Sequence, residues 1–295
     1  MPNIIMYRLV THFGGGSWAL TPEEEQQYIE KIRLLLTIGH TMLKKGYTAL
    51  DTVQKIVELM EDSGYYNCGK GSITNYNGVV EMDAGIMCGK TLRGGAVATV
   101  RTIKNPIKLA RLVMDKTHHR LLACEGADEF GKKKGLETVS DSYFVRYQPV
   151  ETSYFGKAPH ETVGAIALDK YGDLAVASST GGIDDKLKGR IGGVPQLGLE
   201  LYANNKTCAV ACTGIGEPFM RLVTAYDISA QMQYGGKSLE EAVKNIFKEK
   251  VEGGLIAMDK DGNIVKECNA PEMLYGYIKE DGSPFAEMYK TPLKN

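Results

Sequence analysis

Hydrophobic and polar positions divide the chain into segments with helical or strand-like spacing. Residues 21–46 combine an N-cap Thr21, Pro22 at the first helical position, acidic residues in the first turn and lysines near the end, which predicts a helix. Helical spacing of apolar residues returns at 48–62, 105–117, 124–135, 217–235 and 238–251. A short apolar run within 4–18 leads into a Gly cluster and predicts the first strand.

Further strands are predicted where apolar residues run without helical spacing. Strands broken by turns are predicted at 71–89 and 93–103, with Asn77-Gly78 as a hairpin signal. Two further segments, 162–182 and 253–269, each contain two apolar runs on either side of a polar turn. The continuous apolar character of 162–182 predicts a hairpin buried on both faces. Periodicity fades over 141–161, which predicts an exposed linker. Because strands and helices are grouped, the order favours an α+β fold with helices packed on antiparallel sheets.

Composition narrows the classes of function. With 43% apolar and 24% charged residues, the 295-residue chain is expected to form a globular domain spanning 1–295. Its 35 basic and 36 acidic residues, without a basic and aromatic run, argue against a nucleic-acid partner. We also expect no membrane association and, since the first 16 residues lack the features of a secretion signal, a cytoplasmic location. Six cysteines without a C-x-x-C pair predict buried, reduced thiols rather than zinc ligands or disulfides.

The candidate chemistry lies in polar residues beside glycines. The sequence contains no G-x-S-x-G, P-loop, G-x-G-x-x-G after a strand or H-E-x-x-H motif. It does contain four Gly-flanked clusters, "NCGKGS" at 67–72, "SSTGG" at 178–182, "KGRIGG" at 188–193 and "CTGIGE" at 212–217. Each cluster alone is typical of a turn whose side chain binds its own backbone. Four of them, together with Thr162 directly ahead of a buried strand, indicate a site.

These segments resemble a known family. "NCGKGSITNYNGVVEMDAGIM", "AVATVRTIKNPIKLARLVMDKT", "TVGAIALDKYGDLAVASSTGG" and "TGIGE" are similar, in order and spacing, to motifs of the plant-type (type 2) asparaginases and isoaspartyl peptidases. These are N-terminal-nucleophile hydrolases related to aspartylglucosaminidase and threonine aspartase. The resemblance covers nearly the whole chain and implies a four-layer αββα sandwich of two antiparallel sheets flanked by helices.

The resemblance also implies a mechanism for Thr162. In this family the precursor cuts itself before the nucleophilic Thr, so Glu161 would end an α chain (1–161) and Thr162 would begin a β chain (162–295). A free α-amine has a pKa of roughly 8 and can act as the base, which a peptide nitrogen cannot. Thr180 resembles the family's second Thr, which orients the nucleophile. By the family's pattern, Asn67 and Thr213 would stabilise the oxyanion.

The same resemblance implies how a small amino-acid or dipeptide substrate is bound. Arg190 resembles the Arg that holds the substrate α-carboxylate, a role that suits the planar guanidinium fork. Gly214 and Gly216 would line the same pocket. No catalytic metal is expected, although residues 58–69 resemble a loop that holds a structural sodium ion through backbone carbonyls. The resemblance further implies a homodimer of processed αβ units.

Two departures from the family's pattern affect these expectations. Glu161 stands before the nucleophile where the family usually has Gly, whose missing Cβ eases strain at the scissile bond. Gly193 stands where asparaginases have an Asp that pairs with the substrate α-amino group, so open space is expected at this position. Ile215 also replaces a usual His. Free L-asparagine is therefore expected to be a poor substrate.

Three hypotheses follow. The first is a threonine amidohydrolase for L-asparagine or β-aspartyl dipeptides. The second is a threonine aspartase-like or aspartylglucosaminidase-like enzyme with a different substrate, for which Gly193 is the main argument. The third is an unprocessed, non-catalytic relative in which Thr162 stays within the chain.

Overall fold

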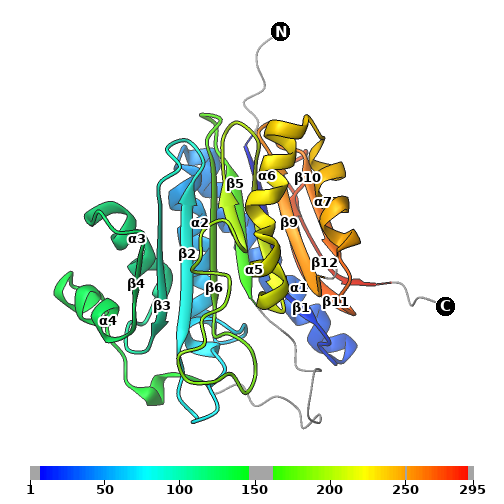
Figure 1. Cartoon of the computed structure of the whole chain (residues 1–295). Helices are drawn as coiled ribbons and strands as arrows, with labels where there is room; N and C mark the ends of the chain where they lie inside the picture. Colours follow the sequence, from blue (N-terminus) through cyan, green and yellow to red (C-terminus); the bar gives the residue numbers. More distant parts are fainter. Residues whose placement is uncertain (1–6, 146–161, 250, 292–295) are drawn as a thin grey trace.

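Two sheets form the centre of the molecule (Figure 1). The computed structural model describes residues 7–145, 162–249 and 251–291. The larger sheet has the strand order β12-β11-β1-β5-β6-β2-β3-β4, and the smaller sheet has the order β10-β9-β8-β7. The larger sheet contains β1 (Arg8–Gly16), β2 (Met82–Cys88), β3 (Gly94–Val100), β4 (Leu121–Ala123), β5 (Val163–Leu168), β6 (Leu174–Thr180), β11 (Glu272–Ile278) and β12 (Pro284–Lys290). The smaller sheet contains β7 (Leu201–Ala203), β8 (Cys208–Gly214), β9 (Gly253–Asp259) and β10 (Ile264–Cys268).

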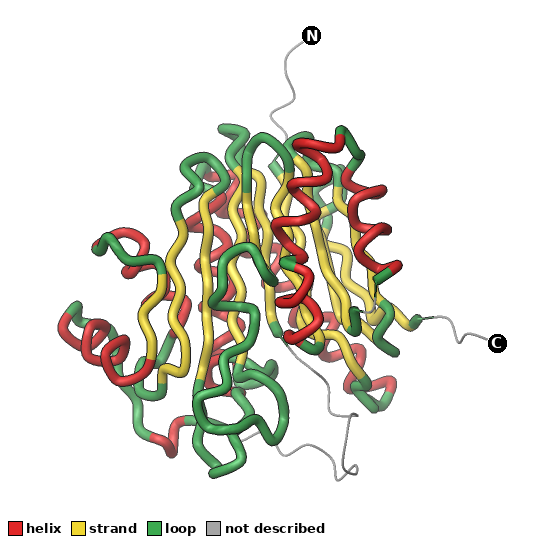
Figure 2. Tube along the Cα trace, viewed as in Figure 1, coloured by secondary structure: helices red, strands yellow, loops and turns green. Residues whose placement is uncertain are grey.

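Helices cover the outer face of each sheet (Figures 1 and 2). Helices α1 (Pro22–Lys45), α2 (Ala49–Ser63) and α3 (Pro106–Lys116) pack on the larger sheet, with α4 (Cys124–Lys133) at its β3–β4 edge. Helices α6 (Thr224–Gly235) and α7 (Leu239–Lys248), preceded by α5 (Gly216–Leu222), pack on the smaller sheet. The layers run helix, sheet, sheet, helix, which confirms the predicted sandwich.

Three layers of apolar side chains hold the sandwich together. Successive side chains along each strand point alternately into two of these layers. In β5, Ala165 and Ala167 face the layer beneath α1–α3, whereas Ile166 and Leu168 face the layer between the two sheets. Side chains of β8 and β9 alternate in the same way between that middle layer and a third layer under α6 and α7. Strands that bury both faces need continuous apolar sequence, so the prediction of a doubly buried hairpin at 162–182 is confirmed.

The predicted helices are confirmed with one difference. Thr21 caps α1 through a reciprocal capping box with Glu24, so local signals fixed this helix. The single helix expected over 217–235 is two helices, because Val223 adopts the left-handed conformation (φ 52°, ψ 43°) between α5 and α6. No polar or glycine signal marks that break.

Several sequence expectations need correction. β3 and β4 pair in parallel, so the larger sheet is not wholly antiparallel. The hairpin expected at Asn77-Gly78 is reduced to a single bridge between Thr74 and Val80. All six cysteines are free, but Cys124 is exposed and Cys88 is half-buried, so the expectation of buried thiols is wrong for these two. Across the described ranges, no helix has the length and apolar content needed to cross a bilayer.

Candidate active site

Thr162 stands immediately before β5, where the two sheets face each other. Its hydroxyl donates a hydrogen bond to Oγ1 of Thr180 over 3.3 Å, and its backbone nitrogen donates to Oγ1 of Thr213 over 3.4 Å. Thr180 ends β6 in the larger sheet, and Thr213 lies in β8 of the smaller sheet. All three residues are buried. The structure therefore brings three of the four predicted catalytic residues together, although they are up to 51 positions apart in sequence.

Backbone amides orient the two supporting hydroxyls. The amide of Gly182 donates to Oγ1 of Thr180 over 2.9 Å, and the amide of Gly15 donates to Oγ1 of Thr213 over 3.2 Å. Gly15 lies at the end of β1, beyond an irregularity in its pairing with β11. Since backbone groups in a packed sheet have little freedom, these contacts hold both hydroxyls in one orientation toward Thr162.

Asn67 lies behind the Thr cluster rather than in the pocket wall. Its side-chain amide donates to the carbonyl of Gly182 over 2.7 Å, and its Oδ1 accepts from the amide of Ile73 over 3.0 Å. Its own carbonyl accepts from the amide of Gly181. Asn67 thus holds the turn that follows Thr180. The oxyanion role assigned to Asn67 and Thr213 remains a prediction.

A narrow pocket opens in front of the Thr162 hydroxyl. Its walls are formed by Thr162, Thr180, Gly182, Ile183, Arg190, Gly192, Val194, Glu200, Gly214 and Gly216. The predicted substrate-binding residues Arg190, Gly214 and Gly216 are among them. The cavity has a volume of about 10 Å³, which is room for about one water molecule.

Arg190 enters this pocket from the loop between β6 and β7. Its Nε and Nη2 bind the carboxylate of Glu217 at 2.9–3.0 Å, and the Arg190 side chain is 14% exposed. Nη1 makes no hydrogen bond to the described part of the chain and points past Gly192, where an added Cβ would lie 3.1 Å from it. One arm of the guanidinium fork is therefore left for a ligand.

The expectation of open space at Gly193 is wrong. A Cβ built on Gly193 would lie 2.5 Å from both Cγ and Oε1 of Glu200, so the Glu200 side chain already occupies this space. The Gly193 amide donates to Oε1 of Glu200 over 3.2 Å. Sequence reasoning missed Glu200 because it precedes β7 in an apolar stretch, seven positions after Gly193, with no motif around it.

Buried charges anchor the loop that carries Arg190. Asp83 in β2 accepts hydrogen bonds from the amides of Gly192 (3.2 Å) and Thr99 (2.8 Å). The ammonium of Lys186 donates to the carbonyl oxygens of Glu81 and Gly181. Burial raises the pKa of Asp83, although the nearby Lys186 acts in the opposite direction, and burial lowers the pKa of Lys186. Neither residue was singled out from the sequence.

His12 is a further buried group beside the nucleophile. It lies in β1 and pairs with Gly164 of β5, two positions after Thr162. Burial lowers its pKa to about 3, although the backbone of Thr162 acts in the opposite direction. Neither ring nitrogen has a well-formed hydrogen bond within the described ranges. The imidazole is therefore neutral. Its only sequence signal was its place two positions before the Gly cluster of the first strand.

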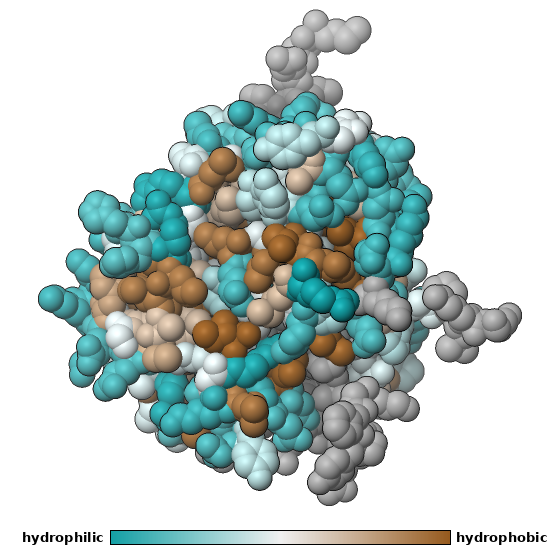
Figure 3. Space-filling model, in the orientation of Figure 1, coloured by the Kyte–Doolittle hydropathy of each residue, from teal (hydrophilic) through white to brown (hydrophobic). Residues whose placement is uncertain are grey.

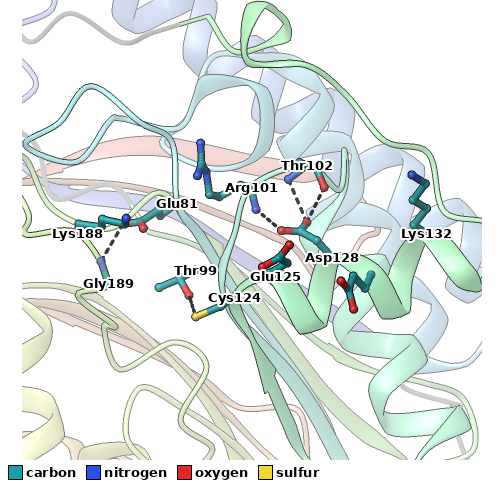
Figure 4. Close-up of a pocket in the computed structure, with 11 residues that line it drawn as sticks. Glu81, Thr99, Arg101, Thr102, Cys124, Glu125, Asp128, Lys132, Lys188 and Gly189 are labelled. Carbon is teal, nitrogen blue, oxygen red and sulfur yellow. Dashed lines mark hydrogen bonds between the residues drawn. The ribbon is translucent and has the colours of Figure 1, made fainter.

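A second, larger pocket has a volume of about 730 Å³ (Figure 4). It is formed by the ends of β2 and β3, by α4 and by the loop at 188–189, and none of the predicted catalytic residues lines it. Thr99 and Cys124 in its wall both have positive φ, and their side-chain O and S atoms are 3.1 Å apart.

On the face seen in Figure 3, hydrophobic residues gather toward the middle and hydrophilic residues follow the edges.

Two sequence predictions concern a bound ion and the processing site. In the part of the chain that the structure describes, no group of three or more His, Cys, Asp or Glu could hold a metal ion. In the loop at 58–69, the carbonyl oxygens of Gly64 and Tyr66 converge on Gly71, where a Cβ would press against both. The carbonyl of Tyr66 also accepts a hydrogen bond from the amide of Cys68 over 2.7 Å, so these contacts show a closely packed turn, and the sodium site stays a prediction. Glu161 and residues 146–161 of the predicted linker lie outside the described residues, whereas Asp141–Tyr143 form a short 3₁₀ helix.

Comparison with known proteins places these features in context. A sequence model of the family described as "Asparaginase" matches residues 5–286. The isoaspartyl peptidase of Salmonella typhimurium is 38% identical over 96% of this chain and 98% of its own length. The putative isoaspartyl peptidase/L-asparaginase of Dictyostelium discoideum is 39% identical, over 93% of this chain and 94% of its own. The isoaspartyl peptidase/L-asparaginase of Homo sapiens is 36% identical, with the same two coverages.

Proposed function

Because the chain belongs to the asparaginase family, we propose that it is a threonine hydrolase acting on L-asparagine and on β-aspartyl (isoaspartyl) dipeptides. One observation supports this most directly. Thr162 and Arg190 line the same pocket, and two further Thr hydroxyls contact Thr162 itself. A nucleophile that shares a pocket with a cation is suited to a substrate that carries a carboxylate near its scissile amide.

Processing before Thr162 would supply the base. In the uncut chain the Thr162 nitrogen is a peptide nitrogen and cannot accept a proton. Cleavage of the bond to Glu161 converts it into an α-amine, which takes the hydroxyl proton as Oγ1 attacks the substrate carbonyl carbon. The amine then passes this proton to the departing ammonia or peptide amine. Water hydrolyses the resulting ester, which frees aspartate and restores the Thr162 hydroxyl.

The hydroxyls of Thr180 and Thr213 would have different roles in this reaction. Thr180 accepts a hydrogen bond from the nucleophile and so orients it. Thr213 lies near the Thr162 nitrogen, where we propose that it contributes with Asn67 to stabilising the oxyanion. Removal of one such donor typically costs about 3 kcal/mol in the transition state.

The alternatives differ in a property that is simple to measure. An unprocessed, non-catalytic relative would remain one chain of 32.3 kDa, whereas the enzyme would give two smaller chains on a denaturing gel. A threonine aspartase-like enzyme would cut Asp-containing proteins rather than dipeptides. The filled space at Gly193 weakens the argument for that second reading.

The decisive experiment combines processing with activity. We expect the purified wild-type protein to yield a new N-terminus that reads TVGAIALD and to hydrolyse β-Asp-Leu or L-asparagine. Thr162→Ala should remain one folded chain without activity, and Thr162→Ser should retain part of both reactions. A different new N-terminus, or full activity of Thr162→Ala, would refute the assignment.

Three finer points belong to the proposal. We infer a cytoplasmic location and a homodimer of processed αβ units from the resemblance, and gel filtration tests the dimer. We also propose, from the resemblance, that backbone carbonyls at 58–69 hold a sodium ion. A higher melting temperature in sodium chloride than in choline chloride at equal ionic strength would support this, and equal values would contradict it.

A further inference from the structure

Glu200 places an ionisable carboxyl group inside the substrate pocket. The residue is 4% exposed, and it lines the cavity together with Thr162 and Arg190. Its carboxyl group accepts one hydrogen bond from the described chain, from the amide of Gly193. A carboxylate can accept about four hydrogen bonds. A buried carboxyl group with one weak partner thus retains capacity for a donor from a ligand.

Glu200 and Arg190 flank the same point of the wall. A Cβ built on Gly216 would lie 2.7 Å from Oε1 of Glu200 and 3.2 Å from Nη2 of Arg190. The two side chains therefore present opposite charges side by side at Gly216, where any side chain larger than hydrogen would contact both. Nη1 of Arg190 is not used by Glu217, so it remains for a second carboxylate.

This pair of charges matches one chemical group. A free α-amino acid carries an ammonium and a carboxylate on one carbon, a few ångströms apart. Bound with its carboxylate at Arg190 and its ammonium at Glu200, such a group would lie in the pocket that Thr162 also lines, where its side chain can reach the Thr162 hydroxyl. A substrate with a blocked or missing amine would leave Glu200 without its donor.

We propose that Glu200 binds the α-ammonium of the substrate, and so restricts the enzyme to L-asparagine and β-aspartyl peptides with a free amine. The proposal rests on the proposed function. It replaces the expectation, drawn from Gly193 alone, that this pocket lacks a counter-charge. The carboxylate reaches the same space from position 200 instead of position 193, and a side chain at one position excludes the other.

The charged groups around Glu200 predict how binding changes with pH. Burial raises its pKa to about 7; Arg190 and the Gly193 amide lower it, whereas Asp83 and Glu217 raise it. The buried thiol of Cys212 also faces it, and its pKa is raised mainly by burial. Since an ammonium pairs with the ionised carboxylate, preference for amine-bearing ligands should weaken as pH falls through about 7.

A matched pair of ligands isolates this contact. N-succinyl-L-leucine has the structure of β-Asp-Leu without the α-amine, so it removes the ammonium and adds no bulk. In the wild-type enzyme we expect its inhibition constant to exceed the KM of β-Asp-Leu by about 10- to 100-fold. In Glu200→Gln this ratio should approach one and lose its pH dependence. The surface variant Glu240→Gln should keep the wild-type ratio.

Moving the carboxylate back provides the second test. Glu200→Gly should lose the discrimination, and Glu200→Gly with Gly193→Asp should recover a large part of it, because Gly193 has no positive φ and the space is then vacant. A wild-type ratio retained in Glu200→Gln, or no recovery in the double variant, would overturn the role of Glu200. Failure of the wild-type enzyme to cleave any asparagine or β-aspartyl substrate would instead refute the proposed function.

Discussion

At the scale of single residues, we expect the Thr180 hydroxyl to orient the hydroxyl of Thr162. It accepts hydrogen bonds from the Thr162 hydroxyl and from the Gly182 amide. Thr180→Val keeps the shape and removes both contacts, so we expect kcat/KM for β-Asp-Leu to fall about 10- to 100-fold. Thr180→Ser keeps the hydroxyl and should retain most of the activity. Equal activity of the Val and Ser variants, measured on fully processed protein, would show that Thr180 does not orient the nucleophile.

Arg190 offers a test of geometry rather than charge. Its fork binds Glu217 through Nε and Nη2, and we propose that Nη1 binds the substrate. Lysine carries the same charge but cannot serve both partners, so we expect Arg190→Lys to raise KM for β-Asp-Leu at least tenfold with a smaller effect on kcat. Arg221→Lys on exposed α5 is the control. An unchanged KM in Arg190→Lys would exclude Arg190 from substrate binding.

Residues of the site differ in how far the sequence could predict them. Thr180 and Arg190 stand in Gly-rich segments, Thr162 stands directly ahead of a buried strand, and family motifs marked all three. Glu200 has no local signal, and His12 has only its place near the Gly cluster of the first strand, because both residues act through contacts with Gly193 and with the strand that begins after Thr162. Tertiary contacts place both residues in the site, and the spacing of residues along the sequence does not predict such contacts.

The break between α5 and α6 leads to a prediction at the scale of elements. Val223 holds a left-handed conformation that β-branched residues disfavour, and its side chain is 41% exposed. Asn tolerates this conformation, so Val223→Asn should stabilise the fold by about 1 kcal/mol and raise the melting temperature by about 2 °C. Ala is not β-branched, but it does not favour the left-handed conformation as Asn does. Val223→Ala should therefore change the melting temperature less than Val223→Asn. A lower melting temperature for Val223→Asn would contradict this reading.

Glu61 joins three elements and makes their packing sensitive to pH. From the end of α2 it accepts hydrogen bonds from Ser179 in β6 and from the amide of Ile107 in α3. Burial raises its pKa from 4.5 to about 8, although both hydrogen bonds act in the opposite direction. The folded protein therefore binds a proton that the unfolded chain releases above about pH 4.5.

The sign of the effect follows from that difference. Stability from protonated Glu61 is fully present below pH 4.5 and is lost as pH rises to about 8, by at most about 1.4 kcal/mol per pH unit. Glu61→Gln cannot titrate, so wild-type stability relative to this variant should decline over that range and then level off. Urea unfolding of both proteins between pH 4.5 and 9 measures the difference. A constant difference would show that Glu61 keeps an ordinary pKa.

Local signals sufficed for some elements and not for others. The cap of α1 and the turn between β5 and β6 lie within a few residues, so both were predicted. β11 and β12 were missed, although they pair with each other around the local turn at 279–283. The position of β1 between β11 and β5 could not be predicted, because that pairing joins residues such as Val10 and Tyr277 across almost the whole chain.

That position of β1 determines how the whole molecule responds to processing. β1 belongs to the first 161 residues, and both of its neighbours, β5 and β11, follow Thr162. We expect the two chains to co-elute in gel filtration after cleavage and to separate only in denaturant. Elution of a free fragment under native conditions would contradict this.

The interleaved sheet also changes the kinetic order of folding. An uncut chain folds in a unimolecular reaction, in which β1 and β11 are held at high effective concentration by the covalent chain. Once the chain is cut, reassembly after unfolding requires two molecules to meet and obeys mass action, so recovery should decline on dilution for the mature protein and not for its precursor. Processing would thus activate the protein and at the same time remove its ability to recover from unfolding at low concentration.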